Sequence, residues 1–205
     1  MGGHHEGDQD LRLGQHGCSK GRRHHSLPSA RYGPALPQAL SQLLMAHPPV
    51  VVMVSAERIR ELDLSPLAAV AALSPAELLP LSGQLELRLL WPTPDDDPRE
   101  MSEIPEVRLW CLRADAEVPW LPLLLERASG TLARHVAMLL PHRFSRNEGL
   151  QFAPDALELW ISHRLFQLDA LSRAAGLDCR QGLGQMAAVL GYELDPGFWA
   201  FASRG

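Results

Sequence analysis

The sequence predicts an α+β fold, with a small, mainly antiparallel three-stranded sheet followed by a helical C-terminal half. A β-branched run at Val50–Val54 and alternating apolar and charged residues from Gln84 to Trp91 predict the sheet. Apolar residues at helical spacing beyond Ser129 predict the helices. An order in which the strands precede the helices is typical of α+β domains.

The segment between these two strands is expected to form short helices. Ser55 can cap a helix that carries Ile59 and Leu62 at helical spacing. Ser65-Pro66 follows the pattern of a cap residue and an N-terminal proline, so a second helix should begin there. The prolines at 75 and 80 leave room for one short turn of helix before a turn at Ser82-Gly83.

A loop of about a dozen residues, 93–104, is expected after the second strand, and loops of this length in a compact domain are usually functional. Glu106–Ala114 is expected to be the third strand. Two strands joined by such a loop most simply pair antiparallel, with Val50–Val54 alongside.

The remaining chain is expected to be mostly helical. A turn at Asn147–Gly149 and a short extended piece at Leu150–Phe152 interrupt this region. Pro154 should open the longest helix, and Gly176 should cap its C-terminus. The expected helices cover residues 119–126, 129–140, 154–175, 180–190 and 195–202.

Residues 1–48 are expected to be a disordered N-terminal extension, and residues 49–205 a single α+β domain. The first 45 residues are rich in Gly, His, Arg and Pro and have no hydrophobic period. The absence of acidic residues from Leu11 to Val54 is a feature of organelle transit peptides, although serine is sparse there. A translation start near Met45 is the alternative.

Composition excludes several classes of protein. The formal net charge is −5, and residues 1–45 carry five basic and three acidic side chains, so the body is acidic. An acidic body disfavours nucleic acid and fits a basic protein partner. The sequence contains no run of 18 apolar residues, so we expect no helix that spans a membrane. The three cysteines are far apart and no Cys-x-x-Cys occurs, so we expect neither a zinc ribbon nor an iron–sulfur cluster held by cysteines, and no other cofactor is expected.

Polar and aromatic residues crowd the stretch from Asp95 to Phe152, where they could converge on one surface. Glu103 and Glu106 are expected to form a charge network with Arg143 and Arg146. Trp120, which lies between two prolines, belongs either to the core or to an interface. The candidate partner-binding residues are Asp95, Asp96, Asp97, Arg99, Glu100, Glu103, Glu106, Trp120, His142, Arg143, Arg146 and Glu148.

No catalytic motif accompanies these residues, since the sequence has no Gly-x-Ser-x-Gly, His-Glu-x-x-His or phosphate-binding glycine loop. A metal-assisted enzyme that uses the Asp95–Glu106 carboxylates with His142 is the alternative to a binding protein. Contiguous carboxylates seldom converge on one ion, which disfavours it. A further alternative is delivery of iron–sulfur clusters through Cys111, which would require a reactive thiolate.

Several blocks of the sequence resemble the chlororespiratory reduction 6 family of cyanobacteria and plastids. The resemblance extends over residues 50–202. The blocks are Asp-Asp-Pro-Arg-Glu (96–100), Ser-Glu-Ile-Pro-Glu-Val-Arg-Leu-Trp (102–110), Pro-Trp-Leu-Pro (119–122), Ala-Met-Leu-Leu-Pro-His-Arg-Phe-Ser-Arg-Asn-Glu-Gly (137–149) and Met-Ala-Ala-Val-Leu-Gly-Tyr-Glu-Leu (186–194).

The resemblance implies a non-catalytic assembly factor for the photosynthetic NAD(P)H dehydrogenase-like (NDH-1) complex. It implies action on the hydrophilic arm of that complex, with the iron–sulfur I subunit as the partner. It also implies a location in the cyanobacterial cytoplasm, or in the chloroplast stroma if the protein is targeted to plastids. It carries over no catalytic residue.

Overall fold

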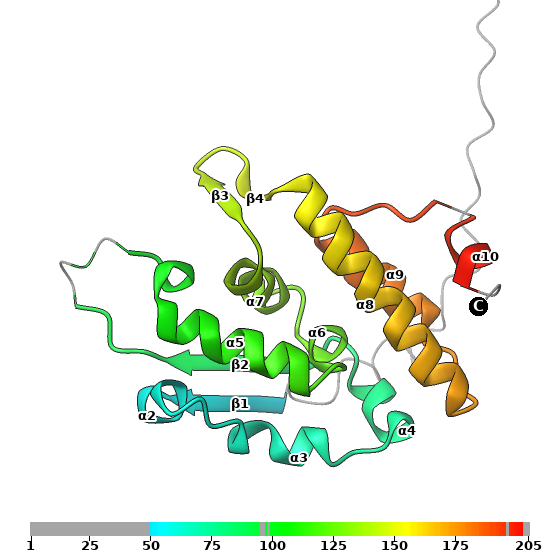
Figure 1. Ribbon diagram of the computed structural model, residues 1–205, viewed down its shortest axis with the longest axis horizontal. Helices are drawn as coiled ribbons and strands as arrows, with labels where there is room; N and C mark the ends of the chain where they lie inside the picture. Colours follow the sequence, from blue (N-terminus) through cyan, green and yellow to red (C-terminus); the bar gives the residue numbers. More distant parts are fainter. Residues whose placement is uncertain (1–49, 95–96, 98, 196, 203–205) are drawn as a thin grey trace, which may run out of the picture. The chain divides into compact units, whose positions relative to one another are not determined.

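The computed structural model of the protein describes residues 50–202, apart from residues 95, 96, 98 and 196 (Figure 1). The expected disordered extension, residues 1–48, lies outside the described residues, and the single domain expected over residues 49–205 stays a prediction. The described chain has two small two-stranded sheets and a helical C-terminal half, which confirms the α+β class. The expected three-stranded sheet is wrong.

The first sheet pairs β1 (Val50–Ser55) and β2 (Leu85–Leu90) in parallel, with Val50 opposite Leu85 and Ser55 opposite Leu90. The expected mainly antiparallel sheet is therefore wrong, since this sheet is a parallel pair and the third strand expected beside β2 is absent from the described residues. A parallel pair needs a crossover of about a dozen residues or more. Short helices between the strands form this crossover: α2 (Ala56–Arg60), η1 (Ser65–Leu67), α3 (Ala68–Ala71), α4 (Pro75–Leu78) and η2 (Leu79–Leu81).

The segment expected to be the third strand is the helix α5 (Pro105–Glu117). Val107, Trp110, Cys111 and Ala114 are all fully buried, and their spacing of three and four residues places them on one face of the helix. Pro105 occupies the first helical position, where the missing N–H costs nothing. The β-branched and aromatic residues of this segment therefore serve helix packing and not a strand.

The helices of the C-terminal half begin close to the positions that the sequence predicts. Pro154 opens α8, and Gly176 follows its end with φ +72°, as expected for a C-terminal glycine. None of the helices in the described part of the chain is long and apolar enough to cross a membrane. The helices are α6 (Leu121–Leu124), α7 (Thr131–Leu139), α8 (Pro154–Ala174), α9 (Arg180–Val189) and α10 (Phe198–Ala202).

A β-hairpin separates α7 from α8 (Figure 1). Its strands, β3 (His142–Ser145) and β4 (Gly149–Phe152), pair antiparallel with His142 opposite Phe152. The expected turn and the extended piece over residues 150–152 are confirmed, whereas the sequence did not predict a strand at β3. Pro141 ends α7 as expected, since Leu140 already has extended backbone angles.

A buried charge network joins α5, α7 and α8. Asp115 accepts hydrogen bonds from Arg164 and from Trp160 Nε1, the latter at 3.3 Å, and His135 Nε2 lies 3.5 Å from Asp115 Oδ1. Burial raises the pKa of Asp115, but the neighbouring His135 and the Arg164 guanidinium outweigh it and hold that pKa below its ordinary value. The carboxylate is therefore charged and paired inside the core.

Candidate protein-contact site

The loop after β2 ends in a short 3₁₀ helix, η3 (Met101–Glu103), which packs against α5 and α7. The Glu103 carboxylate accepts a hydrogen bond of 2.8 Å from the backbone N–H of Glu100, which closes this turn. Ser102 is buried within the turn, while Glu100 and Glu103 are exposed on either side of it. The loop thus buries its hydroxyl and presents its carboxylates to solvent.

His142, the first residue of β3, connects the hairpin to this loop. Its Nδ1 lies 3.0 Å from the carbonyl oxygen of Leu140, and its Nε2 lies 3.2 Å from Ser102 Oγ. Because a carbonyl oxygen can only accept, Nδ1 donates the first of these hydrogen bonds, and Nε2 and the serine hydroxyl form the second. The two hydrogen bonds fix the position of the ring and the distance between η3 and the hairpin.

A groove of about 620 Å³ opens between η3 and the hairpin, and we call it the loop–hairpin groove. A hollow of about 230 Å³ adjoins it, since Glu100, Ser102, His142 and Phe144 line both. The residues that line the groove are Glu100, Ser102, Glu103, Arg108, Leu140, Pro141, His142 and Phe144.

The loop side of the groove is acidic. Glu100, Glu103 and Glu106 are all exposed. Asp97 pairs with Arg99 at 2.6 Å, and hydrogen bonds from Arg99 lower the pKa of Asp97 to about 2. This local pair cancels one acid with one base. The three exposed glutamates outnumber Arg108, the one cation among the described residues that line the groove, so this side keeps a negative charge.

The hairpin lines the groove with His142 and with the aromatic ring of Phe144, and it carries two arginines outside that lining. Arg143 and Arg146 are exposed, and Phe144 between them is 62% exposed. No ion pair in the described residues joins either arginine to Glu103 or Glu106, so the charge network expected between them is not formed. The loop and the hairpin therefore both carry exposed charges, but Arg143 and Arg146 lie outside the lining of the groove itself.

The other candidate residues form a local hydrogen bond, belong to the hydrophobic core, or lie outside the described residues. Glu148 accepts a hydrogen bond of 2.5 Å from Gln151 Nε2 within the hairpin. Trp120 is only 8% exposed and belongs to the hydrophobic core, which agrees with the core alternative, so we omit it from the contact surface. Asp95 and Asp96 lie outside the described residues.

Exposed apolar side chains near the acidic wall were missed by the sequence analysis. Leu109 and Leu112 on α5 are 54% and 44% exposed. A strand would have placed Leu109 on the same face as Val107, but the helix turns it to the opposite side. The signal that reveals it is the helical spacing of the buried residues of α5. Phe144 was missed because its segment was not recognised as a strand.

The chemistry required by the two alternative functions finds no support here. Within the described residues, no three His, Cys, Asp or Glu side chains are grouped so that they could hold a metal ion, and so no observation favours the metal-assisted enzyme. Burial, with the charge of Asp115, raises the pKa of the Cys111 thiol to about 12. Cluster delivery through Cys111 would need the thiolate, which this environment disfavours.

A family model described as chlororespiratory reduction 6 matches residues 54–201. The match runs from the end of β1 into α10 and includes the loop–hairpin groove. No solved structure matches the chain.

Proposed function

Because the chain belongs to the chlororespiratory reduction 6 family, we propose that it is a non-catalytic assembly factor of the photosynthetic NAD(P)H dehydrogenase-like (NDH-1) complex. Its client is the iron–sulfur I subunit of the hydrophilic arm, which it binds before or during assembly of that arm. It acts in the cytoplasm of a cyanobacterium or in a chloroplast stroma. The family match over residues 54–201 is the observation that carries this proposal.

The loop–hairpin groove is the contact surface for the client. Acidic residues on the loop and basic residues on the neighbouring hairpin suit orientation of a partner, because complementary potentials guide encounter and fix register. Phe144 supplies an exposed aromatic ring between Arg143 and Arg146, and aromatic rings and arginines are frequent at the energetic centres of interfaces. The contact residues are Asp97, Arg99, Glu100, Glu103, Glu106, His142, Arg143, Phe144, Arg146 and Glu148, with Asp95 and Asp96 in the same loop.

Binding of purified components tests the proposed client. The full-length protein and the I subunit should form a stable complex in size-exclusion chromatography and in calorimetry. An unrelated ferredoxin-like iron–sulfur protein should not form one. Absence of binding to the I subunit, both with and without its clusters, would remove this subunit as the client.

A genetic measurement tests the assembly role separately. Deletion of the gene should lower the amount of assembled NDH-1 complex. The amounts of the other photosynthetic complexes should stay unchanged. A normal level of fully assembled NDH-1 in the deletion strain would contradict the assembly function.

A further inference from the structure

The outer edge of β2 is largely without backbone partners. In a parallel pair, alternate residues of each strand bond to the neighbour. The N–H of Val50 donates to Gln84 O at 3.0 Å, so Gln84 and every second residue after it face β1. Leu85, Leu87 and Leu89 therefore direct their N–H and C=O groups to the opposite edge.

One residue already occupies the position of a third strand on that edge. Leu85 forms a parallel bridge with Leu125, and its carbonyl oxygen accepts from the N–H of Glu126 at 2.8 Å. The chain then turns away into α7. In the described residues no backbone hydrogen bond reaches the edge-facing groups of Leu87 or Leu89. Leu125 thus occupies the first residue position of a third strand, and in the described residues no backbone continues this strand beside Leu87 and Leu89.

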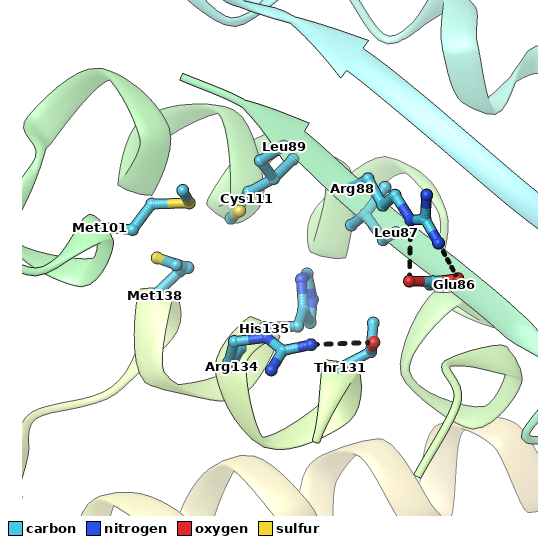
Figure 2. A pocket seen from close by; sticks show the side chains of 10 residues that line it. All are labelled: Glu86, Leu87, Arg88, Leu89, Met101, Cys111, Thr131, Arg134, His135 and Met138. Atoms are coloured by element: carbon cyan, nitrogen blue, oxygen red, sulfur yellow. Dashed lines mark hydrogen bonds and ion pairs between the residues drawn. The ribbon is translucent and has the colours of Figure 1, made fainter. Parts of the chain in front are cut away.

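A cavity of about 280 Å³ lies beside this empty position. Figure 2 shows β2 along one side and the α7 residues Arg134 and His135 along the other, with Met101, Met138 and Cys111 grouped at one end. Thioether side chains adapt to varied apolar groups, which suits a binding cavity. The cavity can therefore take apolar side chains next to an unpaired strand edge.

A buried polar group also faces this cavity. The His135 side chain is 1% exposed and lines the cavity wall. Its Nδ1 has no hydrogen-bond partner in the described residues, and its Nε2 is within 3.5 Å of Asp115 Oδ1 but makes no hydrogen bond there. A buried imidazole nitrogen without a partner is unfavourable. The cavity therefore has hydrogen-bonding capacity in addition to its apolar walls.

The charged side chains at the rim of the cavity indicate which charge a bound segment should carry there. Arg88 pairs with Glu86 through hydrogen bonds of 2.8 Å and 3.0 Å. Arg134 is exposed and bonds the carbonyl of Ser129 and the hydroxyl of Thr131, with no carboxylate partner among the described residues. The rim thus has one cation in excess, which complements an acidic side chain.

We propose that the β2 edge binds an extended segment of a partner protein, which adds as a third strand beside Leu87 and Leu89. Its backbone pairs with the free edge, and its apolar side chains at alternate positions enter the cavity. An acidic residue of the segment lies against Arg134. The proposal does not rest on the proposed function, because it concerns a different surface and its test uses a synthetic peptide in place of the I subunit.

The probe is an acetylated and amidated peptide that alternates valine and threonine and ends in glutamate. Titrated into the full-length protein labelled with ¹⁵N, it should shift the amide signals of Leu87 and Leu89 and slow their hydrogen exchange. Methylation of one edge-facing peptide amide should weaken binding about tenfold, since it removes one hydrogen bond. No change at Leu87 and Leu89, or equal binding of the methylated peptide, would overturn the proposal.

A charge exchange tests the orientation of the segment. Arg134→Glu should weaken the glutamate peptide roughly two- to fivefold and strengthen a peptide that ends in lysine by a similar factor. Arg173→Glu, which makes the same charge change on α8, should alter neither affinity. Shifts confined to β1, or no exchange of preference in Arg134→Glu, would contradict this placement.

Discussion

Ser102 and His142, which lie 40 residues apart in the sequence, are joined by a hydrogen bond of 3.2 Å between Oγ and Nε2. Ser102 lies in η3 at the end of the acidic loop, and His142 begins the first strand of the hairpin. The bond therefore holds the acidic loop and the hairpin, which form the two sides of the loop–hairpin groove, in a fixed relation.

Loss of this hydrogen bond should loosen the hairpin. Ser102→Ala should lower the free energy of unfolding by about 0.5–1.5 kcal/mol, since it removes one hydrogen bond and leaves the imidazole without its partner. Hydrogen exchange measured by mass spectrometry should become faster over residues 142–152 and stay unchanged over α9. Unchanged exchange in the hairpin would show that the bond does not hold it in place.

Truncation of two neighbouring residues of α5 should change the free energy of unfolding by very different amounts. Trp110 is fully buried and donates a hydrogen bond of 2.9 Å to the carbonyl of Asp63, so Trp110→Ala should lower the free energy of unfolding by about 3–5 kcal/mol. Leu109 is 54% exposed, and Leu109→Ala should change it by less than about 0.5 kcal/mol. Chemical denaturation measures both, and a large loss for Leu109→Ala would contradict the helical assignment.

Removal of the buried carboxylate of α5 should be costly. The side chains of Asp115 and Arg164 are 10% and 6% exposed, and Asp115→Ala would leave a buried guanidinium without its counter-charge. The free energy of unfolding should fall by about 3–5 kcal/mol. Glu117→Ala on the same helix removes an exposed pair with Arg113 and should cost about 0.5 kcal/mol at most. Equal effects in urea denaturation would show that the buried pair is unimportant.

The same carboxylate should contribute to acid sensitivity. The pKa of Asp115 is lower in the folded chain than its ordinary value, so the folded state favours the charged form. This stabilisation is complete above the unfolded-state pKa, about 3.9, and is lost as the pH falls through the folded-state pKa. As the pH falls below about 4, the free energy of unfolding should therefore decrease less for Asp115→Asn than for the wild type. Parallel pH profiles of the urea midpoint would contradict this.

Local signals in the sequence predicted much of the fold. Pro154 and the apolar stripe after it indicated α8, and the β-branched run indicated β1, because these signals depend only on nearby residues. The region of α5 was wrongly expected to be a strand because Val107–Leu112 is a short apolar run interrupted only by Arg108, and periodicity alone does not assign such a run to a strand or a helix. The parallel pairing of β1 with β2 depends on how the crossover helices pack, which local periodicity does not contain.

The candidate site was predicted as a set of segments and not as a geometry. Residues of η3 and of the hairpin line one groove, while the single contact surface expected from the crowd of polar residues stays a prediction. The hydrogen bond between Ser102 and His142 joins residues too distant in the sequence for spacing to reveal it. The sequence also did not predict which opposite charges form ion pairs, because charge alone does not specify the partner. The pairs expected of Glu103 and Glu106 with Arg143 and Arg146 are therefore not found among the described residues.

The central claim is that the I subunit binds at the loop–hairpin groove and that the exposed glutamates in and beside it contribute to the affinity. The most direct measurement is calorimetric binding of the I subunit to Glu100→Gln/Glu103→Gln/Glu106→Gln, compared with the control Glu61→Gln/Glu158→Gln/Glu193→Gln. Both variants lose three exposed carboxylates, so their net charges are equal. The account predicts a loss of about tenfold or more in affinity for the first variant and almost none for the control. Equal affinity of both variants and the wild type would contradict it.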